Sequence, residues 1–318
     1  MTLMTDIQSA DGIATVSLAQ PLEDIADELG RSFAEYGFAV VRDHGIPLDL
    51  IDRAEEKSKE FFALPESVKR GYQLPKGGGA RGYTPFGTEK AKDAEVQDLK
   101  EFWHVGRSLP EGHELSEFMA PNIWPSEIDG FKDTFSELYS AFETAGGRVL
   151  EAIALHLGLD RKFFESTVED GNSVMRLLHY PPLGDEAPEG AIRAAAHGDI
   201  NTITLLLGAE EAGLELLTKQ GEWKAVDTPE GALVINVGDM LDRLTNSKLR
   251  STTHRVVNPR GEAAKRSRFS MPFFLHFRPD YEIRTLESCI EPGKESDAPA
   301  PISSHEFLLQ RLREINLA

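Results

Sequence analysis

The feature that most constrains the fold of this chain is a series of short apolar runs between residues 174 and 278. These runs are VMRLLHY, ITLLL, LELLT, WKAV, ALVINVG, HRVV and RFSMPFFLHF, with turn residues between them. Apolar runs of this length, separated by turn residues, are typical of β-strands. Because no helical pattern of useful length intervenes, the strands are predicted to be antiparallel and to close into a sandwich, a jelly roll or a barrel.

Helical patterns precede this β-rich region. Apolar residues at helical spacing predict helices at 22–36 and 48–63, with a short strand, FAVV, between them. A longer apolar stripe predicts a scaffold helix at 131–157. Residues 72–130 are rich in Gly, Pro and charge, so we expect mostly loop there, with one strand near KEFWHVG.

These patterns divide the chain into two parts that we expect to form one globular unit. Residues 1–130 form a mixed region of helix, strand and loop that packs on the core. Residues 131–318 contain the long helix, a β-rich core at about 174–278 and a final helix. Ser303 and Glu306 have the spacing of a capping box at the start of that helix.

Composition narrows the compartment and the partners. The single cysteine, Cys289, excludes an internal disulfide and a Cys-rich zinc site, and it favours a reducing compartment. The segment MTLMTDIQSADG lacks the basic and apolar regions of a signal peptide, and no apolar run approaches the ~18 residues of a membrane span. We therefore expect a cytoplasmic protein with no membrane contact; the sequence leaves the oligomeric state open.

The charge distribution is strongly acidic overall. Asp and Glu outnumber Lys and Arg by 53 to 34, giving a formal net charge of -19, which predicts that nucleic acid is not a partner. Residues 243–278 are the exception, because their nine Lys and Arg residues face one acid, Glu262. Either these are solvated strand and loop faces, or the segment lines a site where an anion binds.

Three residues in the β-rich region have the chemistry of a metal site. His197 and Asp199 are two apart, so on an extended strand both side chains point to the same side. His254, in STTHRVVNP, supplies a third ligand if the sheet folds back. Two neutral imidazoles and one carboxylate form a facial triad, whose three open positions suit Fe(II). The alternative is a hydrogen-bonded His and Asp pair at a strand start.

A second pair in this region is suited to a carboxylate. Arg268 and Ser270, in RFSMPFF, present a guanidinium and a hydroxyl on one face of a strand. If this strand lies beside that of His254, a dicarboxylate could chelate the metal at one end while Arg268 and Ser270 hold the other. The alternative is an ordinary surface arginine on an alternating strand.

With these residues, the sequence resembles the iron(II)- and 2-oxoglutarate-dependent dioxygenases, specifically the subfamily that includes isopenicillin N synthase and the plant flavonoid and gibberellin oxygenases. The resemblance covers nearly the whole chain. Its motifs are GFAVVRDHGIP, RGYTPFG, DLKEFWHVGR, MRLLHYPP, HGDINTITLLL, EAGLELL, LVINVGDMLDRLTNSKLRSTTHRVV and RFSMPFF. Their order and combination are more specific than the triad alone.

The resemblance implies both a fold and a site. The fold is α+β, with a double-stranded β-helix (jelly-roll) core of antiparallel strands flanked by N-terminal, central and C-terminal helices. His197, Asp199 and His254 would be the iron ligands. Arg268 and Ser270 would hold the far carboxylate of 2-oxoglutarate.

It also implies an activity: a dioxygenase that uses Fe(II), 2-oxoglutarate and O2 to hydroxylate or desaturate a small-molecule metabolite, with release of succinate and CO2. Tyr180, in HYPP, would face the co-substrate or the prime substrate, and its phenol could donate a hydrogen bond there. Two alternatives stay open. One is an iron-dependent oxidase of the same subfamily that does not use 2-oxoglutarate, and the other is a non-catalytic jelly-roll binding protein.

Three departures from the family pattern accompany the resemblance. Leu178 stands where many plant members have asparagine, so one polar contact would be missing. Gly198 stands where threonine is common, and the absence of a side chain there would widen the approach to the metal. The segment RVVNPRGEAAKRS between His254 and Arg268 is longer than expected, and we interpret it as a lengthened hairpin loop.

Overall fold

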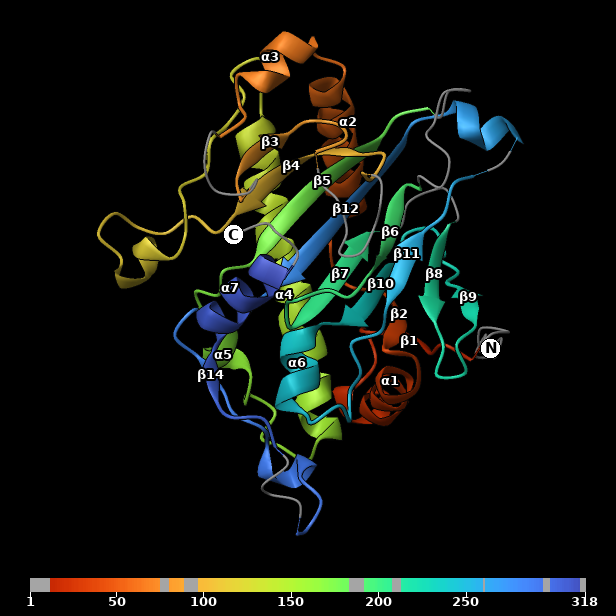
Figure 1. Cartoon of the computed structure of the whole chain (residues 1–318), viewed down its shortest axis with the longest axis vertical. Coiled ribbons are helices and arrows are strands. Elements are labelled where there is room, and N and C mark those ends of the chain that lie inside the picture. The colour runs from red at the N-terminus through yellow and green to blue at the C-terminus, as the bar shows by residue number, and fades with distance from the viewer. Residues whose placement is uncertain are drawn as a thin grey trace.

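The centre of the fold is a large β-sheet with helices on one face and a smaller sheet on the other (Figure 1). The coordinates are a computed structural model, and the structure describes residues 12–74, 80–88, 97–182, 192–207, 213–259, 261–293 and 298–314.

The larger sheet has the strand order β1 (Thr15–Ser17), β2 (Phe38–Arg42), β10 (Leu233–Val237), β7 (Ile203–Leu207), β12 (Arg268–Leu275), β5 (Val174–Tyr180), β4 (Glu101–Gly106) and β3 (Gly82–Thr84). Its strand pairs are antiparallel except for β1 with β2. The smaller sheet has the order β6 (Ala194–His197), β11 (His254–Val256), β8 (Leu214–Leu217) and β9 (Trp223–Ala225), and all its pairs are antiparallel. A separate pair consists of β13 (Glu282–Ile283) and β14 (Ile302–Ser303).

The helices are α1 (Leu22–Tyr36), α2 (Leu48–Phe62), α3 (Glu66–Arg70), α4 (Phe131–His156), α5 (Glu165–Val168), α6 (Asp239–Leu244) and α7 (Ser304–Glu314). Short 3-10 helices occupy Glu114–Glu117, Gly261–Lys265 and Glu287–Cys289. Within the described ranges, none of the helices has the length and apolar character needed to cross a membrane.

Alternation along the strands gives the larger sheet two different faces. The outer face, which includes Leu205 and Phe273, belongs to the main apolar core together with Phe33 of α1, Phe61 of α2 and Phe135 of α4. In Figure 1 these helices lie behind the sheet. The chain before residue 130 thus shares one apolar cluster with the β-rich region.

The inner face of the larger sheet packs against the smaller sheet. Phe38, Val40 and Val234 lie in a second apolar cluster with Leu216 and Val256 of the smaller sheet. Two antiparallel sheets packed face to face form the jelly roll, so the predicted α+β class is confirmed.

Most predicted elements are confirmed, with boundary shifts of one residue in α2 and α4. The Ser303 capping box is present, because its hydroxyl accepts from the Glu306 backbone N–H at 3.2 Å and donates to the Glu306 carboxylate at 2.9 Å. Elements too short to give a period, such as β1 and α6, have no counterpart in the predicted pattern.

The predicted hairpin between His254 and Arg268 is wrong. His254 begins β11 in the smaller sheet, whereas Arg268 begins β12 in the larger sheet, between β5 and β7. The intervening segment therefore crosses from one sheet to the other. The strand of Arg268 does not lie beside the strand of His254; it faces it across the core.

Gly37 ends α1 and fixes its position relative to the strand of His254. Its φ of 70° lies in the left-handed region, and its N–H bonds to the Phe33 carbonyl, as in a helix C-cap. A Cβ at this position would overlap the Arg250 carbonyl oxygen and Thr252 Oγ1. Only glycine allows the segment that leads into β11 to approach so closely.

Candidate functional site

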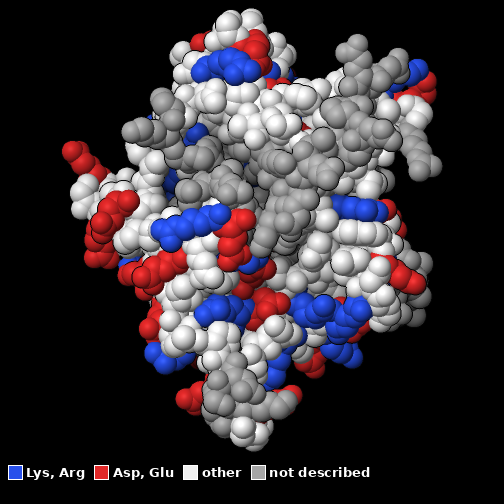
Figure 2. Space-filling view, in the orientation of Figure 1, with Lys and Arg blue, Asp and Glu red and all other residues white. Residues whose placement is uncertain are grey.

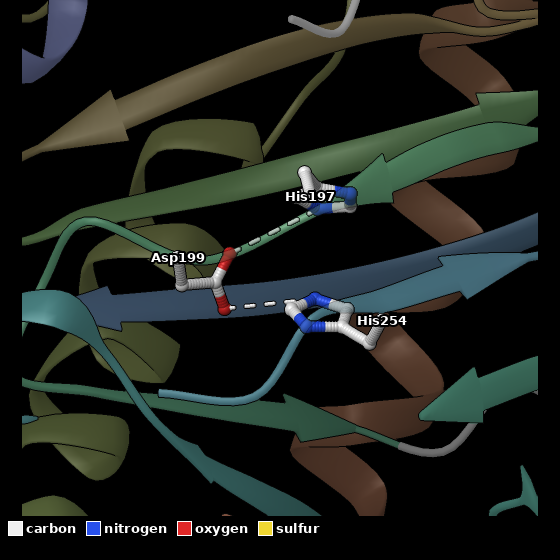
Figure 3. A group of neighbouring side chains, drawn as sticks. All are labelled: His197, Asp199 and His254. Carbon is white, nitrogen blue, oxygen red and sulfur yellow. Dashed lines mark ion pairs between the residues drawn. The ribbon is translucent and has the colours of Figure 1, made fainter. Parts of the chain in front are cut away.

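His197, Asp199 and His254 come together between the two sheets, with their polar atoms turned toward one another (Figure 3). His197 ends β6 and pairs directly with His254 at the start of β11. Their ligand atoms lie within 4.8 Å of one another. His197 Nε2 is 4.0 Å from Asp199 Oδ1, and His254 Nε2 is 3.9 Å from Asp199 Oδ2.

The spacing of His197 and Asp199 predicts that a single strand directs both side chains to one side, and this prediction is only partly right. Asp199 lies two residues beyond the end of β6, so strand alternation does not orient its carboxylate. Two hydrogen bonds to Oδ2 do so instead, from Asn236 Nδ2 at 2.8 Å and from Thr204 Oγ1 at 2.5 Å. Both donors lie on the inner face of the larger sheet, in β10 and β7. Since Oδ2 accepts both bonds, Oδ1 has more lone-pair capacity for a metal.

Backbone carbonyls orient both imidazoles. His197 Nδ1 lies 2.7 Å from the Ala195 carbonyl oxygen, and His254 Nδ1 lies 3.0 Å from that of Thr252. These contacts place the ring proton on Nδ1 and leave the lone pair on Nε2, which faces Asp199. A metal-binding histidine usually donates such a hydrogen bond from its other ring nitrogen.

The electrostatics of the cluster favour the metal-binding protonation states. Burial, followed by the neighbouring His254, lowers the pKa of His197 although 38% of its side chain remains exposed. Burial alone would raise the pKa of Asp199, but the two imidazoles and the bonds from Asn236 and Thr204 outweigh it and hold that pKa below its ordinary value. Metal ligands must be a neutral imidazole and an ionised carboxylate, and both shifts favour these forms.

This donor set fits a catalytic metal rather than a structural one. Two imidazoles and one carboxylate on one side of an ion leave positions open for other ligands, as in non-haem Fe(II) sites. A structural zinc site would be closed with four protein ligands, usually including thiolates.

Arg268 and Ser270 lie on the inner face of β12, buried to 4% and 5% exposure. Arg268 pairs across the strands with Tyr180 of β5, and its guanidinium lies 5.1 Å from the centre of the Tyr180 ring. Its Nη1 donates to Ser270 Oγ at 3.4 Å. This burial excludes an ordinary surface arginine and leaves a cationic fork beside a hydroxyl and a phenol.

Models of known protein families match two segments of the chain. Residues 10–127 match the N-terminal domain described as non-haem dioxygenase in morphine synthesis, and residues 171–277 match the 2OG-Fe(II) oxygenase superfamily. A 2-oxoglutarate-Fe(II) type oxidoreductase, hxnY of Emericella nidulans, is 32% identical over 94% of this chain and 84% of its own. The chain belongs to the 2-oxoglutarate- and iron(II)-dependent dioxygenases.

Solved structures agree with this membership. A 2OG-Fe(II) oxygenase family protein from Caulobacter crescentus superposes with a TM-score of 0.89 at 55% identity, covering 96% of this chain and 99% of that one. A Neurospora crassa protein solved in complex with α-ketoglutarate (2-oxoglutarate) and thymine has a TM-score of 0.84 at 29% identity, covering 96% of this chain and 98% of that one.

The protein is therefore a 2-oxoglutarate-dependent Fe(II) dioxygenase that oxidises a small molecule. Fe(II), 2-oxoglutarate and O2 are its cofactor and co-substrates. Relatives are named for 2-oxoglutarate, and similar structures contain it. They therefore do not favour an oxidase that works without 2-oxoglutarate, nor a non-catalytic binding protein.

The basic segment 243–278 of the dioxygenase is mostly surface. Arg255 pairs with Glu215 at 2.8 Å, and Lys265 pairs with Glu262 at 2.7 Å. Figure 2 shows Lys and Arg interspersed with Asp and Glu on one face of the molecule. Arg268 is the arginine of this segment that the structure places on the buried inner face, so the surface interpretation does not apply to it.

Several site residues escape sequence reasoning. In the sequence, Thr204 and Asn236 are not distinguishable from other polar strand residues, although alternation along β7 and β10 places both on the inner face. His276 follows β12 in the same alternation, and burial lowers its pKa to about 4, with Asp199 close enough to oppose that shift. The guanidinium of the fully buried Arg193 lies 5.8 Å from the centre of the Tyr180 ring, so two guanidinium groups lie near this tyrosine.

Gly198 does not widen the approach to the metal in the way its small size suggested. A Cβ built there would meet Ser251 Oγ at 3.4 Å and Asp239 Oδ1 at 3.6 Å, both ordinary contacts. The missing side chain thus points toward Ser251 and Asp239. Leu178 lies opposite Ser270 on the inner face and packs with Phe102 and Tyr180, so an apolar contact replaces the asparagine of plant members.

Proposed function

We propose that His197, Asp199 and His254 bind the Fe(II) of this dioxygenase. The observation that carries the proposal is the orientation of the three side chains. Each Nδ1 is engaged by a backbone carbonyl, each Nε2 faces Asp199, and Asp199 is held by Asn236 and Thr204. These contacts preset the ligands before an ion arrives, which lowers the cost of binding.

We also propose that Arg268 and Ser270 hold the far carboxylate of 2-oxoglutarate, with Tyr180 beside them. Burial of both side chains supports this role, because a desolvated guanidinium binds a carboxylate far more strongly than an exposed one. The two groups lie in the sheet opposite His254, so one dicarboxylate would link both sheets of the jelly roll. Arg193 adds a second positive charge near Tyr180.

When bound, iron and 2-oxoglutarate supply the oxidising chemistry, in which O2 is consumed and succinate and CO2 are released. The chain supplies orientation and charge matching. Arg268 would fix the direction in which 2-oxoglutarate lies, and the apolar group formed by Phe102, Leu178 and Tyr180 would keep water from that end of the site.

Anaerobic addition of Fe(II) and 2-oxoglutarate tests these assignments. The chelate has a metal-to-ligand charge-transfer band in the visible range, which we expect for the wild-type protein. Arg268→Ala removes the charge-assisted pair and should weaken 2-oxoglutarate binding by at least tenfold, because such a pair contributes about 1.5–3 kcal/mol. Asp199→Ala should abolish the band.

Arg255→Ala is the matched control, since Arg255 belongs to the same basic segment but forms a partly exposed ion pair with Glu215. Its titration should follow that of the wild type. If Arg255→Ala and Arg268→Ala lose 2-oxoglutarate affinity equally, the proposed role of Arg268 is refuted. A charge-transfer band that survives Asp199→Ala would refute the proposed set of iron ligands.

A further inference from the structure

Arg81 presents a buried guanidinium edge that no described group satisfies. The residue is 2% exposed and lies immediately before β3. Its Nη1 donates to the Ala80 carbonyl at 2.7 Å. Its Nε and Nη2 are buried and have no hydrogen-bond partner among the residues that the structure describes. These two atoms form the side-on edge of the guanidinium, the edge that binds a carboxylate through two parallel bonds.

The guanidinium lies on the inner face of the larger sheet, over β4. A Cβ built on Gly106 would overlap the Arg81 Cζ, so the group sits directly above this glycine. Gly106 belongs to one cross-strand row of the inner face, and the same row contains the residues that hold Asp199. The row consists of Gly106, Val174, Phe274, Thr204 and Asn236.

The row gives an approximate spacing. Gly106 and Thr204 are three strand spacings apart, or roughly 14 Å. His276 interacts electrostatically with both Arg81 and Asp199, so it lies near each of them. Arg268 lies at the other end of β12 from Phe274, so Arg81 and Arg268 occupy different parts of the inner face. The distance from Arg81 to Thr204 is one that a small organic molecule can span.

A second cation on this face, Arg176, is already engaged. Its Nε donates to His104 Nε2 at 2.6 Å, and its guanidinium stacks over the Phe102 ring at 4.2 Å and the Phe274 ring at 5.4 Å. Arg107, which directly follows Gly106 after the end of β4, pairs with Glu143 and donates to the Gly171 carbonyl. Arg81 differs from both, because its Nε and Nη2 have no hydrogen-bond partner among the described residues. A desolvated charge normally has a counter-ion, and the described residues supply none that bonds to these two atoms.

We propose that Arg81 binds a carboxylate of the prime substrate through Nε and Nη2, and so orients the substrate toward the iron. The inference rests on the proposed function, because it places the substrate between Arg81 and the metal ligands. It assigns the substrate to small organic acids whose carboxylate lies on the order of 10 Å from the carbon that is oxidised. The carboxylate would supply the counter-ion that the described residues around Arg81 do not provide.

Thermal unfolding of the anaerobic Fe(II)- and 2-oxoglutarate-loaded protein tests the site with defined probes. The probes are acetate, benzoate and cyclohexanecarboxylate, each compared with its primary amide at equal ionic strength. We expect at least one acid to raise the wild-type midpoint by about 2 °C or more, and the amides to have no effect. Arg81→Met should abolish the acid effect, and Arg81→Lys, which keeps the charge but loses the fork, should reduce it.

The variants also separate a binding role from a structural one. Arg81→Met removes an uncompensated buried charge, so its ligand-free midpoint should equal or exceed that of the wild type, whereas Arg107→Met should melt lower because it leaves Glu143 without its partner. An Arg81→Met protein that melts lower or fails to fold, acids without effect on the wild type, or an acid effect that persists in Arg81→Met would each overturn the proposal. The charge-transfer band should persist in Arg81→Met; its absence from the wild type would instead refute the proposed function.

Discussion

At the scale of single residues, the orientation of the site depends on groups that are not themselves ligands. Backbone carbonyls decide which nitrogen of each site histidine faces Asp199, and Thr204 and Asn236 decide how the carboxylate lies. Sequence spacing identifies the ligand candidates because their residue types are unusual together. It does not identify Thr204 and Asn236, because a threonine and an asparagine on a strand carry no distinctive chemistry until the fold places them beside a carboxylate.

Thr204→Val tests this support directly. The substitution keeps the shape of the side chain but removes the 2.5 Å hydrogen bond to Asp199 Oδ2. We expect Fe(II) affinity to fall by about tenfold to hundredfold, as is typical when a residue that orients a metal ligand is lost. Titration of Fe(II) against the charge-transfer band at saturating 2-oxoglutarate measures this. Thr144→Val is the control, since that hydroxyl bonds to the Ser140 carbonyl on the exposed side of α4; equal affinities in the two variants would contradict the proposed support.

Gly198→Ala should be tolerated. The new Cβ would make only ordinary contacts with Ser251 and Asp239, and the backbone is not in the left-handed region. Alanine also reduces the entropy of the unfolded chain, so stability should be unchanged or rise by about 0.4–1 kcal/mol. Urea unfolding and 2-oxoglutarate titration check both points. A large loss of either would mean that the metal site requires glycine here.

At the scale of elements, periodicity predicts the long and strongly patterned pieces and fails for the short ones. Helix α4 is evident from its apolar stripe, and β12 from its alternation. Sequence alone cannot assign β11 and β12 to different sheets, because a strand pattern reports which face is buried and not which neighbour it pairs with. The expected hairpin after His254 failed for this reason.

Two adjacent glycines of α4 should respond in opposite directions to the same substitution. A Cβ on Gly146 would lie 2.5 Å from Leu275 Cδ1 of β12, whereas one on Gly147 would meet nothing within 4 Å. Gly147→Ala should stabilise the protein by up to about 1 kcal/mol through helix propensity. Gly146→Ala must displace the buried Leu275 side chain, which is closely packed, so it should be less stable than Gly147→Ala by about 1–3 kcal/mol. Similar midpoints in chemical denaturation would show that α4 does not pack as closely as described.

At the scale of the whole molecule, the site joins parts that are distant in sequence. The proposed metal ligands belong to the smaller sheet and the turn after β6, whereas Arg268 and Ser270, the residues proposed to hold 2-oxoglutarate, belong to the larger sheet. We propose that residues 1–130 and 131–318 fold as one unit, since Phe33 and Phe61 lie in the same apolar cluster as Leu205. The family motifs predict this architecture, while the facing arrangement of the two sheets emerges only in three dimensions.

Because ligands would link the two sheets, their removal should lower global stability. Fe(II) and 2-oxoglutarate at roughly 100-fold over their dissociation constants should each add about 2.7 kcal/mol to the free energy of unfolding. Anaerobic melting curves before and after treatment with a chelator measure this difference. Asp199→Ala should melt at the same temperature with and without Fe(II), and an Fe(II)-dependent rise in that variant would place the ion elsewhere.

Anomalous diffraction at the iron edge, from crystals grown anaerobically with Fe(II) and 2-oxoglutarate, tests the central claim most directly. The proposal predicts a single strong peak within about 2.0–2.2 Å of His197 Nε2, His254 Nε2 and an Asp199 oxygen. It also predicts 2-oxoglutarate density that extends from this peak to Arg268 and Ser270. A peak away from these three residues, or a 2-oxoglutarate molecule whose far carboxylate does not reach Arg268, would contradict it.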